Sequence, residues 1–194
     1  MVAPVKVNLK VYQGSTFSET FRWESATKVY KPITAIYQQA PMVVVAEAHG
    51  VPAGWRVKLT NISGMKEANT TDYIIATTTN TDTLTFNDIN AIAYTAYTSG
   101  GIVEYNQPND LTGYTARMHI REKVSSTTTI LELTTENSLI SINNTNKTIS
   151  INIPATTTET FTFKSAVYSM ELINGVVVTP FIYGSLVLDT EITR

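Results

Sequence analysis

The chain has 194 residues, a formal net charge of -2, 15% charged residues and 43% hydrophobic residues. This length and this balance predict one or two compact domains and exclude wholesale disorder, because a chain this apolar can bury a core. The chain contains no cysteine, which excludes disulfides and thiolate chemistry and fits assembly in a reducing cytoplasm.

The sequence shows no sign of export, membrane insertion or duplex binding. Its start lacks a basic segment followed by a long apolar core, so we expect no signal peptide. Apolar runs such as residues 42–46 are far shorter than the ~20 residues that a membrane helix needs. Basic residues are scattered, whereas a duplex-binding face needs a cluster. We therefore expect a protein that is made in the cytoplasm and contacts neither a membrane nor nucleic acid directly.

The first part of the chain contains two β-rich runs. Residues 6–11 alternate weakly between apolar and polar, and Gly14 and Ser15 then form a turn before residues 17–23 alternate again. Two such runs on either side of a glycine turn predict a hairpin or two neighbouring strands. Pro32 follows and ends this pattern.

The segment from residue 31 to residue 105 carries short β-rich runs between glycine-bearing turns. The turns are His49-Gly50, Ser63-Gly64 and Gly100-Gly101. Expected strands cover residues 55–59, 73–77, 83–86 and 101–105. Tight turns at these spacings predict a small β-barrel.

The clearest alternation in the chain covers residues 114–121. Every second residue there is apolar or small, and the residues between them are Thr115, Arg117, His119 and Arg121. This pattern predicts a half-buried strand with one solvent-exposed face. Further strands are expected at residues 129–134, 139–142 and 148–153, at the spacing of a sandwich.

The C-terminal part is predicted to contain one helical turn and two strands. Thr156 and Glu159 are spaced as in a capping box, which predicts a short helical turn after Pro154. Strands are expected at residues 168–172 and 181–192, with a hairpin turn at Asn174-Gly175. Because no stretch keeps a 3.6-residue apolar period, the sequence predicts an all-β protein.

The block from His49 to Gly101 resembles the small β-barrel known as the first catalytic cysteine half-domain of ubiquitin-activating enzymes. Copies of that barrel also look to be inserted into structural proteins of tailed bacteriophages. Adenylation and thioester transfer need a nucleotide-binding domain and a cysteine. This chain has neither a glycine-rich phosphate loop nor a cysteine, so the resemblance implies a shared shape without the enzyme's chemistry.

The flanking sequence is similar to a phage virion module found at the neck or collar and at the baseplate. The similarity lies in residues 14–17, 110–117, 168–172 and 184–194. It implies an immunoglobulin-like, BppU-like β-sandwich made of residues 1–30 and 106–194, interrupted by the barrel at residues 31–105. Tyr168 is expected at a tyrosine corner, with its hydroxyl bonded back to the preceding loop.

No pattern in the sequence indicates catalysis, a cofactor or a metal. His49 and His119 are the only histidines, and neither has neighbouring carboxylates at metal-ligand spacing. The nucleophile elbow of the hydrolases is absent. We therefore expect a protein that is not an enzyme, with no catalytic residue, no cofactor and no metal.

The resemblance implies a structural virion protein that forms an oligomeric collar at the head–tail neck. Its expected partners are copies of itself and virion proteins such as neck, portal, tail or fibre proteins, and its expected location is the virion. One alternative is a baseplate or fibre-anchoring tail module. Another is a carbohydrate-binding sandwich that would use exposed aromatics such as Tyr94, Tyr97 and Tyr105.

Six residues are candidate interface residues, on the barrel turns and on the exposed face of the 114–121 strand: His49, Trp55, Arg56, Arg117, His119 and Arg121. Two of them have a second interpretation. His49 can bond the backbone of its own turn. Trp55 can fill the core of the barrel, because large aromatic side chains are usually mostly buried.

Overall fold

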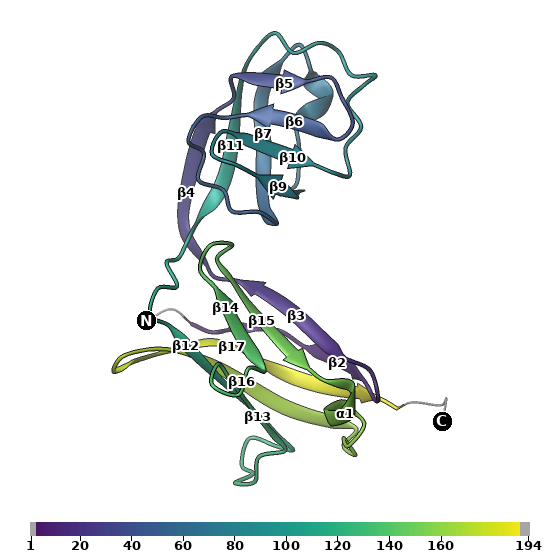
Figure 1. Ribbon diagram of the computed structural model, residues 1–194, viewed down its shortest axis with the longest axis vertical. Coiled ribbons are helices and arrows are strands. Elements are labelled where there is room, and N and C mark those ends of the chain that lie inside the picture. The colour runs from purple at the N-terminus through teal and green to yellow at the C-terminus, as the bar shows by residue number, and fades with distance from the viewer. Residues whose placement is uncertain (1–2, 191–194) are drawn as a thin grey trace. The chain divides into compact units, whose positions relative to one another are not determined.

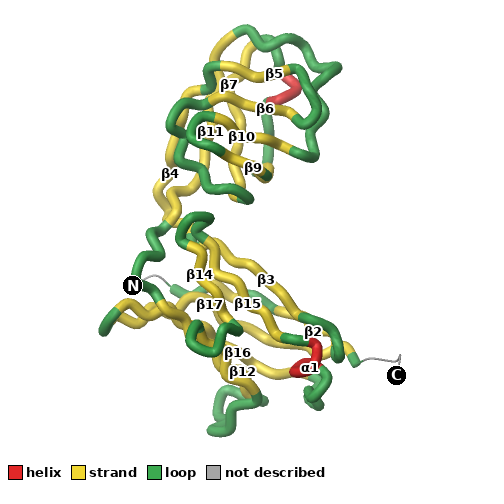
Figure 2. The backbone as a smooth tube through the Cα atoms, in the orientation of Figure 1, coloured by secondary structure: helices red, strands yellow, loops and turns green. Residues whose placement is uncertain are grey.

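The computed structural model describes residues 3–190, in which strands and loops make up nearly the whole chain (Figure 2). The predicted all-β class is confirmed, with 53% of residues in strands and 4% in helices. Its physical basis is the abundance of β-branched residues, which favour strands and disfavour helices. None of the helices in residues 3–190 is both long and apolar enough to span a membrane.

The chain divides into two compact units. One is discontinuous and contains residues 1–22 and 110–194; we call it the split unit. The other contains residues 23–109; we call it the central unit.

The larger sheet of the split unit has six strands (Figure 1). Their order is β1-β17-β16-β12-β13, and β2 also pairs with β17. Both β1 and β2 run parallel to β17, whereas the other pairs are antiparallel. The strands are β1 Val5–Lys6, β2 Leu9–Tyr12, β12 Thr115–Arg121, β13 Leu131–Thr134, β16 Ser165–Asn174 and β17 Val177–Asp189.

The smaller sheet of the split unit has the order β14-β15-β3, with strands β14 Ile140–Asn143, β15 Thr148–Ile153 and β3 Phe17–Arg22. Alternate residues of β15 and of β12 are fully buried, such as Ile151 and Met118. The two sheets therefore share one apolar core, as in a β-sandwich. The predicted hairpin turn at Asn174-Gly175 is confirmed between β16 and β17.

The predicted pairing of the first two β-rich runs is wrong. The chain turns at Gly14, but β2 pairs with β17 and β3 pairs with β15. The turn therefore carries the chain from the larger sheet to the smaller one. Alternation predicts a strand but not its partner, because one buried face suits either sheet.

Two local predictions in the C-terminal part are also wrong in detail. The helical turn α1 Ala155–Thr158 is present, but Pro154 is its N-cap and no side chain caps it. The hydroxyl of Tyr168 donates to the carbonyl of Val7 at 2.7 Å, in place of the preceding loop. The last residues of the predicted strand at 181–192 lie outside the described residues.

The chain crosses closely over β17 between β1 and β2. The Val7 amide donates to the Tyr183 carbonyl at 2.8 Å, and the Val7 carbonyl accepts from Tyr168. A Cβ atom added to Gly184 would lie 1.9 Å from the Val7 carbonyl oxygen. Glycine at this position therefore permits the crossing that places β1 on the edge of the sheet.

The central unit contains two four-stranded sheets, with the orders β5-β6-β10-β9 and β4-β11-β7-β8. The chain passes directly from one sheet to the other between β4 and β5 and between β8 and β9, so both sheets enclose one core. The elements are β4 Glu24–Pro32, β5 Ala35–Tyr37, β6 Met42–Val45, β7 Trp55–Ser63, the 3-10 turn η1 Lys66–Ala68, β8 Ile74–Ala76, β9 Thr78–Thr79, β10 Thr83–Phe86 and β11 Ser99–Pro108.

The bounds of the central unit differ from the predicted insertion at residues 31–105. β4 and β11 pair from Ile102↔Pro32 to Pro108↔Glu24, with a shift of register between Asn106 and Pro108. The predicted bounds therefore fall inside this ladder. The Trp23 carbonyl then accepts from both the backbone amide and the side-chain amide of Asn109, at 3.0 and 3.1 Å. These bonds hold the two ends of the unit together, and composition alone carried no signal for them.

A polar cluster fastens the loop before β12 to the β14–β15 turn. The Asp110 carboxylate accepts from the Lys147 ammonium at 3.0 Å and from the Thr112 hydroxyl at 3.0 Å. The Lys147 bond, followed by bonds from Asn144 and Thr112, lowers the pKa of Asp110 from 3.8 to about 2.

We expect Asp110 to contribute stability that is lost in acid. Because its pKa is lower in the folded state, its contribution is present above pH 3.8 and is lost as the pH falls towards about 2. Asp110→Asn should therefore flatten the pH dependence of unfolding in this window, measured by circular dichroism in urea. Equal slopes for D110N and wild type would contradict the prediction.

Candidate binding site

Two of the six candidate interface residues are buried, so the prediction that they contact a partner is wrong. The side chain of Trp55 is 0% exposed and that of His49 is 1% exposed. Trp55 begins β7 and lies in the core of the central unit with residues such as Met42 and Phe86. Trp55 is therefore a core residue, as its second interpretation states.

His49 stabilises its own turn. Its Nδ1 atom accepts from the Val51 amide at 2.9 Å, and its Nε2 atom lies 3.3 Å from the Thr83 carbonyl. An Nδ1 acceptor and a carbonyl beside Nε2 together select the neutral tautomer with its proton on Nε2. Burial lowers the pKa of His49 from its ordinary value of 6.5, although the backbone bond to Thr83 partly opposes this.

We expect the central unit to lose stability as the pH falls below 6.5. The neutral imidazole is favoured by folding, so its contribution is present above pH 6.5 and is lost as the pH falls towards the lower folded pKa. His49→Asn should reduce this acid-side loss. Both tryptophans lie within residues 23–109, so urea unfolding followed by tryptophan fluorescence reports on this unit. The control is His119→Asn, which leaves His49 in place. In this variant the central unit should still lose stability as the pH falls.

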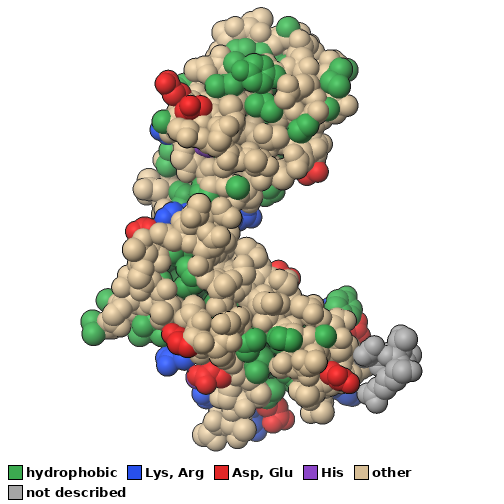
Figure 3. All heavy atoms as spheres, in the orientation of Figure 1, with side chains coloured by type: hydrophobic (Ala, Val, Ile, Leu, Met, Phe, Trp, Pro, Cys, Tyr) green, Lys and Arg blue, Asp and Glu red, His purple; other side chains and the backbone are tan. Residues whose placement is uncertain are grey.

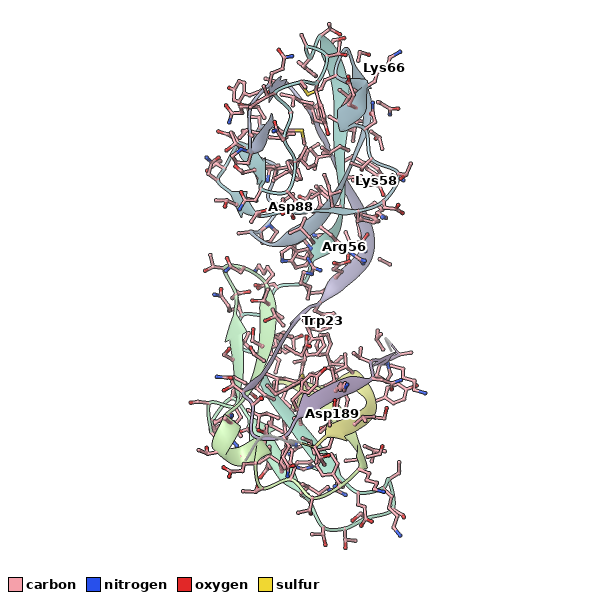
Figure 4. The ribbon with its side chains drawn as sticks, turned by 90° about the vertical axis from the view of Figure 1, so that its right-hand side faces the viewer. Trp23, Arg56, Lys58, Lys66, Asp88 and Asp189 are labelled. Carbon is pink, nitrogen blue, oxygen red and sulfur yellow. The ribbon has the colours of Figure 1, made fainter. Side chains whose placement is uncertain are left out.

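Arg56 is exposed but is bound within the central unit (Figure 4). Its Nε and Nη2 atoms donate to the carboxylate of Glu24 on β4, at 3.0 and 2.6 Å. The guanidinium also lies over the ring of Tyr73, 5.1 Å from the centroid. The Glu24 bond raises the pKa of Arg56. A bidentate pair of this kind orders the side chain and uses much of its donor capacity.

The aromatic residues considered for carbohydrate binding are used within the central unit. Tyr105 is 3% exposed, and its hydroxyl donates to the His49 carbonyl. The Tyr97 hydroxyl bonds the carbonyls of Ile33 and Gly100 at 3.1 and 2.9 Å. The third residue, Tyr94, is partly buried against the core of the central unit, as is Tyr97. The hydroxyls of Tyr97 and Tyr105 therefore support the fold.

The remaining three candidates come together on the outer face of the larger sheet. They line a hollow of about 670 Å³ that lies wholly within the split unit, and we call it the outer groove. Its lining residues are Lys6, Asn8, Arg117, His119, Arg121, Val124, Val167, Tyr168, Ser169, Glu171, Tyr183, Gly184 and Ser185.

The register of the sheet sets where the charges of the outer groove lie. One row across five consecutive strands consists of Lys6, Tyr183, Ser169, His119 and Glu132. A second row consists of Ser185, Val167 and Arg121. Since paired residues point to the same face of a sheet, the cations of these two rows lie on β1 and β12 and the residues between them are uncharged. In the row of Arg117, its neighbour on β16 is the acidic Glu171.

The cations of the outer groove differ in how far they are neutralised. Arg117 donates to Glu171 at 3.0 Å, and His119 lies 3.0 Å from Glu132. Arg121 bonds only a backbone carbonyl, that of Ser126, among the bonds of the described residues. Lys6 forms none of the ion pairs found in residues 3–190.

Charged side chains of both signs lie close together on the surface of the split unit (Figure 3). Within the outer groove the fixed cations Lys6, Arg117 and Arg121 outnumber the one lining carboxylate, Glu171. The groove therefore has an excess of positive charge in a chain whose net charge is -2. Such a site attracts an anionic group.

The sequence identified only part of this site. Alternation along residues 114–121 located the three β12 residues. Tyr183 joins them because β17 pairs with β16, and Lys6 joins them because β1 pairs with β17. These residues are distant in the sequence, and no periodicity encodes a parallel pair between chain ends. A polar alternation in β16, at Ser169 and Glu171, is the local signal that could have extended the prediction.

Within residues 3–190, no three histidine, aspartate or glutamate side chains gather as a metal site requires. The sequence matches no protein-family model and no curated protein. The fold and the site thus define an all-β protein with a cationic groove on the outer face of a sandwich sheet.

Proposed function

We propose that the chain is a structural subunit that works by binding copies of itself and other proteins, as part of an oligomeric collar at the neck of a tailed bacteriophage. The virion setting rests on the resemblance of residues 14–17, 110–117, 168–172 and 184–194 to the phage module. The baseplate is the alternative position, because that module is used at both sites.

The observation that carries the binding role is the arrangement of edge strands in the split unit. Among the described residues, β3 and β14 each pair on one side only, with β15, and β13 pairs only with β12. Unpaired backbone N–H and C=O groups along an edge can pair with a strand of another chain. In a ring, neighbouring subunits would cover these edges.

The proposal is tested on the purified chain and on the phage particle. We expect multimers in light scattering coupled to size exclusion, rings or partial rings in negative-stain images, and the chain in purified virions by mass spectrometry. Antibody labelling at the neck supports the collar, and labelling at the distal tail supports the baseplate. A chain that stays monomeric at high concentration and is missing from virions would overturn the proposal.

We expect charge reversal on the outer groove to weaken assembly without unfolding the chain. Arg117→Glu places a new carboxylate beside Glu171, and Arg121→Glu reverses the charge beside Val167, further along the same face of β12. Like charges at an interface cost affinity, so the dissociation constant for assembly should rise about tenfold or more. Sedimentation equilibrium measures this change.

The matched control is the double variant Lys10→Glu with Lys164→Glu, in the same unit. Lys10, like Arg117, is half-exposed and forms an ion pair, with Asp189 at 2.8 Å. Neither control residue lines the outer groove. Unchanged assembly in R117E/R121E, or equal weakening in the control, would show that this face is not an interface.

A further inference from the structure

We infer that the outer groove binds a short, extended, acidic segment of a protein partner, held by Lys6 at one end and Arg121 at the other. This inference rests on the proposed function in taking the partner to be a protein. It goes further by naming the chemistry of the segment and the residues that select it.

Charge and pairing single out Lys6 and Arg121 as the anchors. Arg117 and His119 already lie 3.0 Å from carboxylates, so an added anion there would compete with Glu171 and Glu132. Lys6 forms none of the ion pairs found in residues 3–190. Arg121 donates one hydrogen bond, to the backbone carbonyl of Ser126. A guanidinium with spare donors can bind a carboxylate in a bidentate way.

The spacing of the anchors fits an extended peptide. Lys6 on β1 and Arg121 on β12 are separated by three strand-to-strand steps, through β17 and β16. At about 4.8 Å for each step this is about 14 Å across the strands. Arg121 also lies two residues along β12 from His119, which shares the row of Lys6, and this offset of about 7 Å brings the separation to about 16 Å. An extended chain covers this distance in about five residues, so the ligand should carry two acidic side chains about five positions apart.

The floor of the groove favours small apolar or polar side chains between the two acids. Apart from Glu171, it is made by uncharged residues of β17 and β16, including Tyr183, Val167 and Ser169. Val124, 87% exposed on the loop after β12, adds an apolar side to the groove. A segment that contains valine or threonine would pack against these surfaces, whereas a segment of long charged side chains would make no apolar contact with them.

The same residues argue against a nucleic acid or another polyanion. Glu171 lines the groove, and Glu132 lies beside His119 at the end of the same row. A phosphate at every step of a polymer would be placed against these carboxylates, with too few free cations to release many counterions. Two separated negative charges match the site better than a continuous line of them.

The test measures binding of fluorescein-labelled peptides to the full chain by anisotropy at low salt. The acidic probe is a short peptide with two glutamates five positions apart and valine and threonine between them. Matched probes carry two glutamines or two lysines at those positions, and an oligothymidylate serves as the polyanion. We expect the acidic probe to bind at least about tenfold more tightly than the glutamine probe, with affinity falling as salt rises.

Variants then locate the binding. Lys6→Gln and Arg121→Gln should each weaken the acidic probe at least about fivefold, whereas Lys164→Gln, an exposed lysine outside the groove, should leave it unchanged. Circular dichroism checks that each variant is folded. Equal binding of acidic and glutamine probes, tighter binding of oligothymidylate, or no effect of K6Q and R121Q would each overturn the inference.

The outcomes separate this inference from the proposed function. If the chain forms multimers and is present in virions but does not bind the acidic probe, the inference fails and the proposed function stands. If the probe binds through Lys6 and Arg121 but the chain is monomeric and absent from virions, the proposed collar fails, and the groove keeps its specificity for acidic segments.

Discussion

Replacing Trp55 by alanine should destabilise the central unit by about 3–5 kcal/mol, the range for removing a large buried aromatic side chain. Trp55 is 0% exposed and lies in a core with Met42, Leu59 and Phe86. The loss combines the apolar area returned to water with the cavity left behind. Chemical unfolding followed by the fluorescence of the remaining Trp23 measures it.

Trp23→Ala is the matched control for this substitution. Trp23 belongs to the same unit but is only partly buried, where the chain enters β4. We expect a loss of stability clearly smaller than for W55A, because less area and less cavity volume are involved. A W55A variant within about 1 kcal/mol of wild type would contradict burial of Trp55 in the core.

Replacing Gly184 by alanine should destabilise the split unit by about 3 kcal/mol or more. The added Cβ would lie 1.9 Å from the carbonyl oxygen and 2.7 Å from the carbonyl carbon of Val7. These are backbone atoms, so no rotamer change relieves the overlap, and β1 must move away. The move would cost the bonds that Val7 forms with Tyr183 and Tyr168, at about 1 kcal/mol each, in addition to the strain.

Gly175→Ala, in the β16–β17 turn of the same unit, is the control for G184A. Gly175 has a φ of 58°, but an added Cβ meets nothing within 4 Å. The cost should be about 1 kcal/mol, the penalty for a left-handed conformation without a clash. Hydrogen exchange of residues 5–12 should rise in G184A and stay unchanged in G175A. Equal exchange in both variants would show that the crossing tolerates a side chain.

Local pattern was sufficient to predict most strands but not the charge map of the site. β10 and β15 have the predicted bounds, and the β12 alternation correctly separated Met118 and Ile120 from Arg117 and His119. Burial of Trp55 and His49 could not be decided locally. Whether the side chains beside a glycine turn point to solvent or to the core depends on which sheet the next strand joins.

The amino-acid sequence is enough to establish that this protein is all-β, that the 114–121 strand has one polar face, and that thiol chemistry is excluded. These properties follow from composition and from a two-residue period, both of which are local. Three further features are seen only in the folded chain: β1 and β2 lie parallel to β17, Lys6 lines the same groove as Arg121, and β4 pairs with β11. Such pairings join residues far apart in the chain, and their selection depends on the packing of whole sheets around a core.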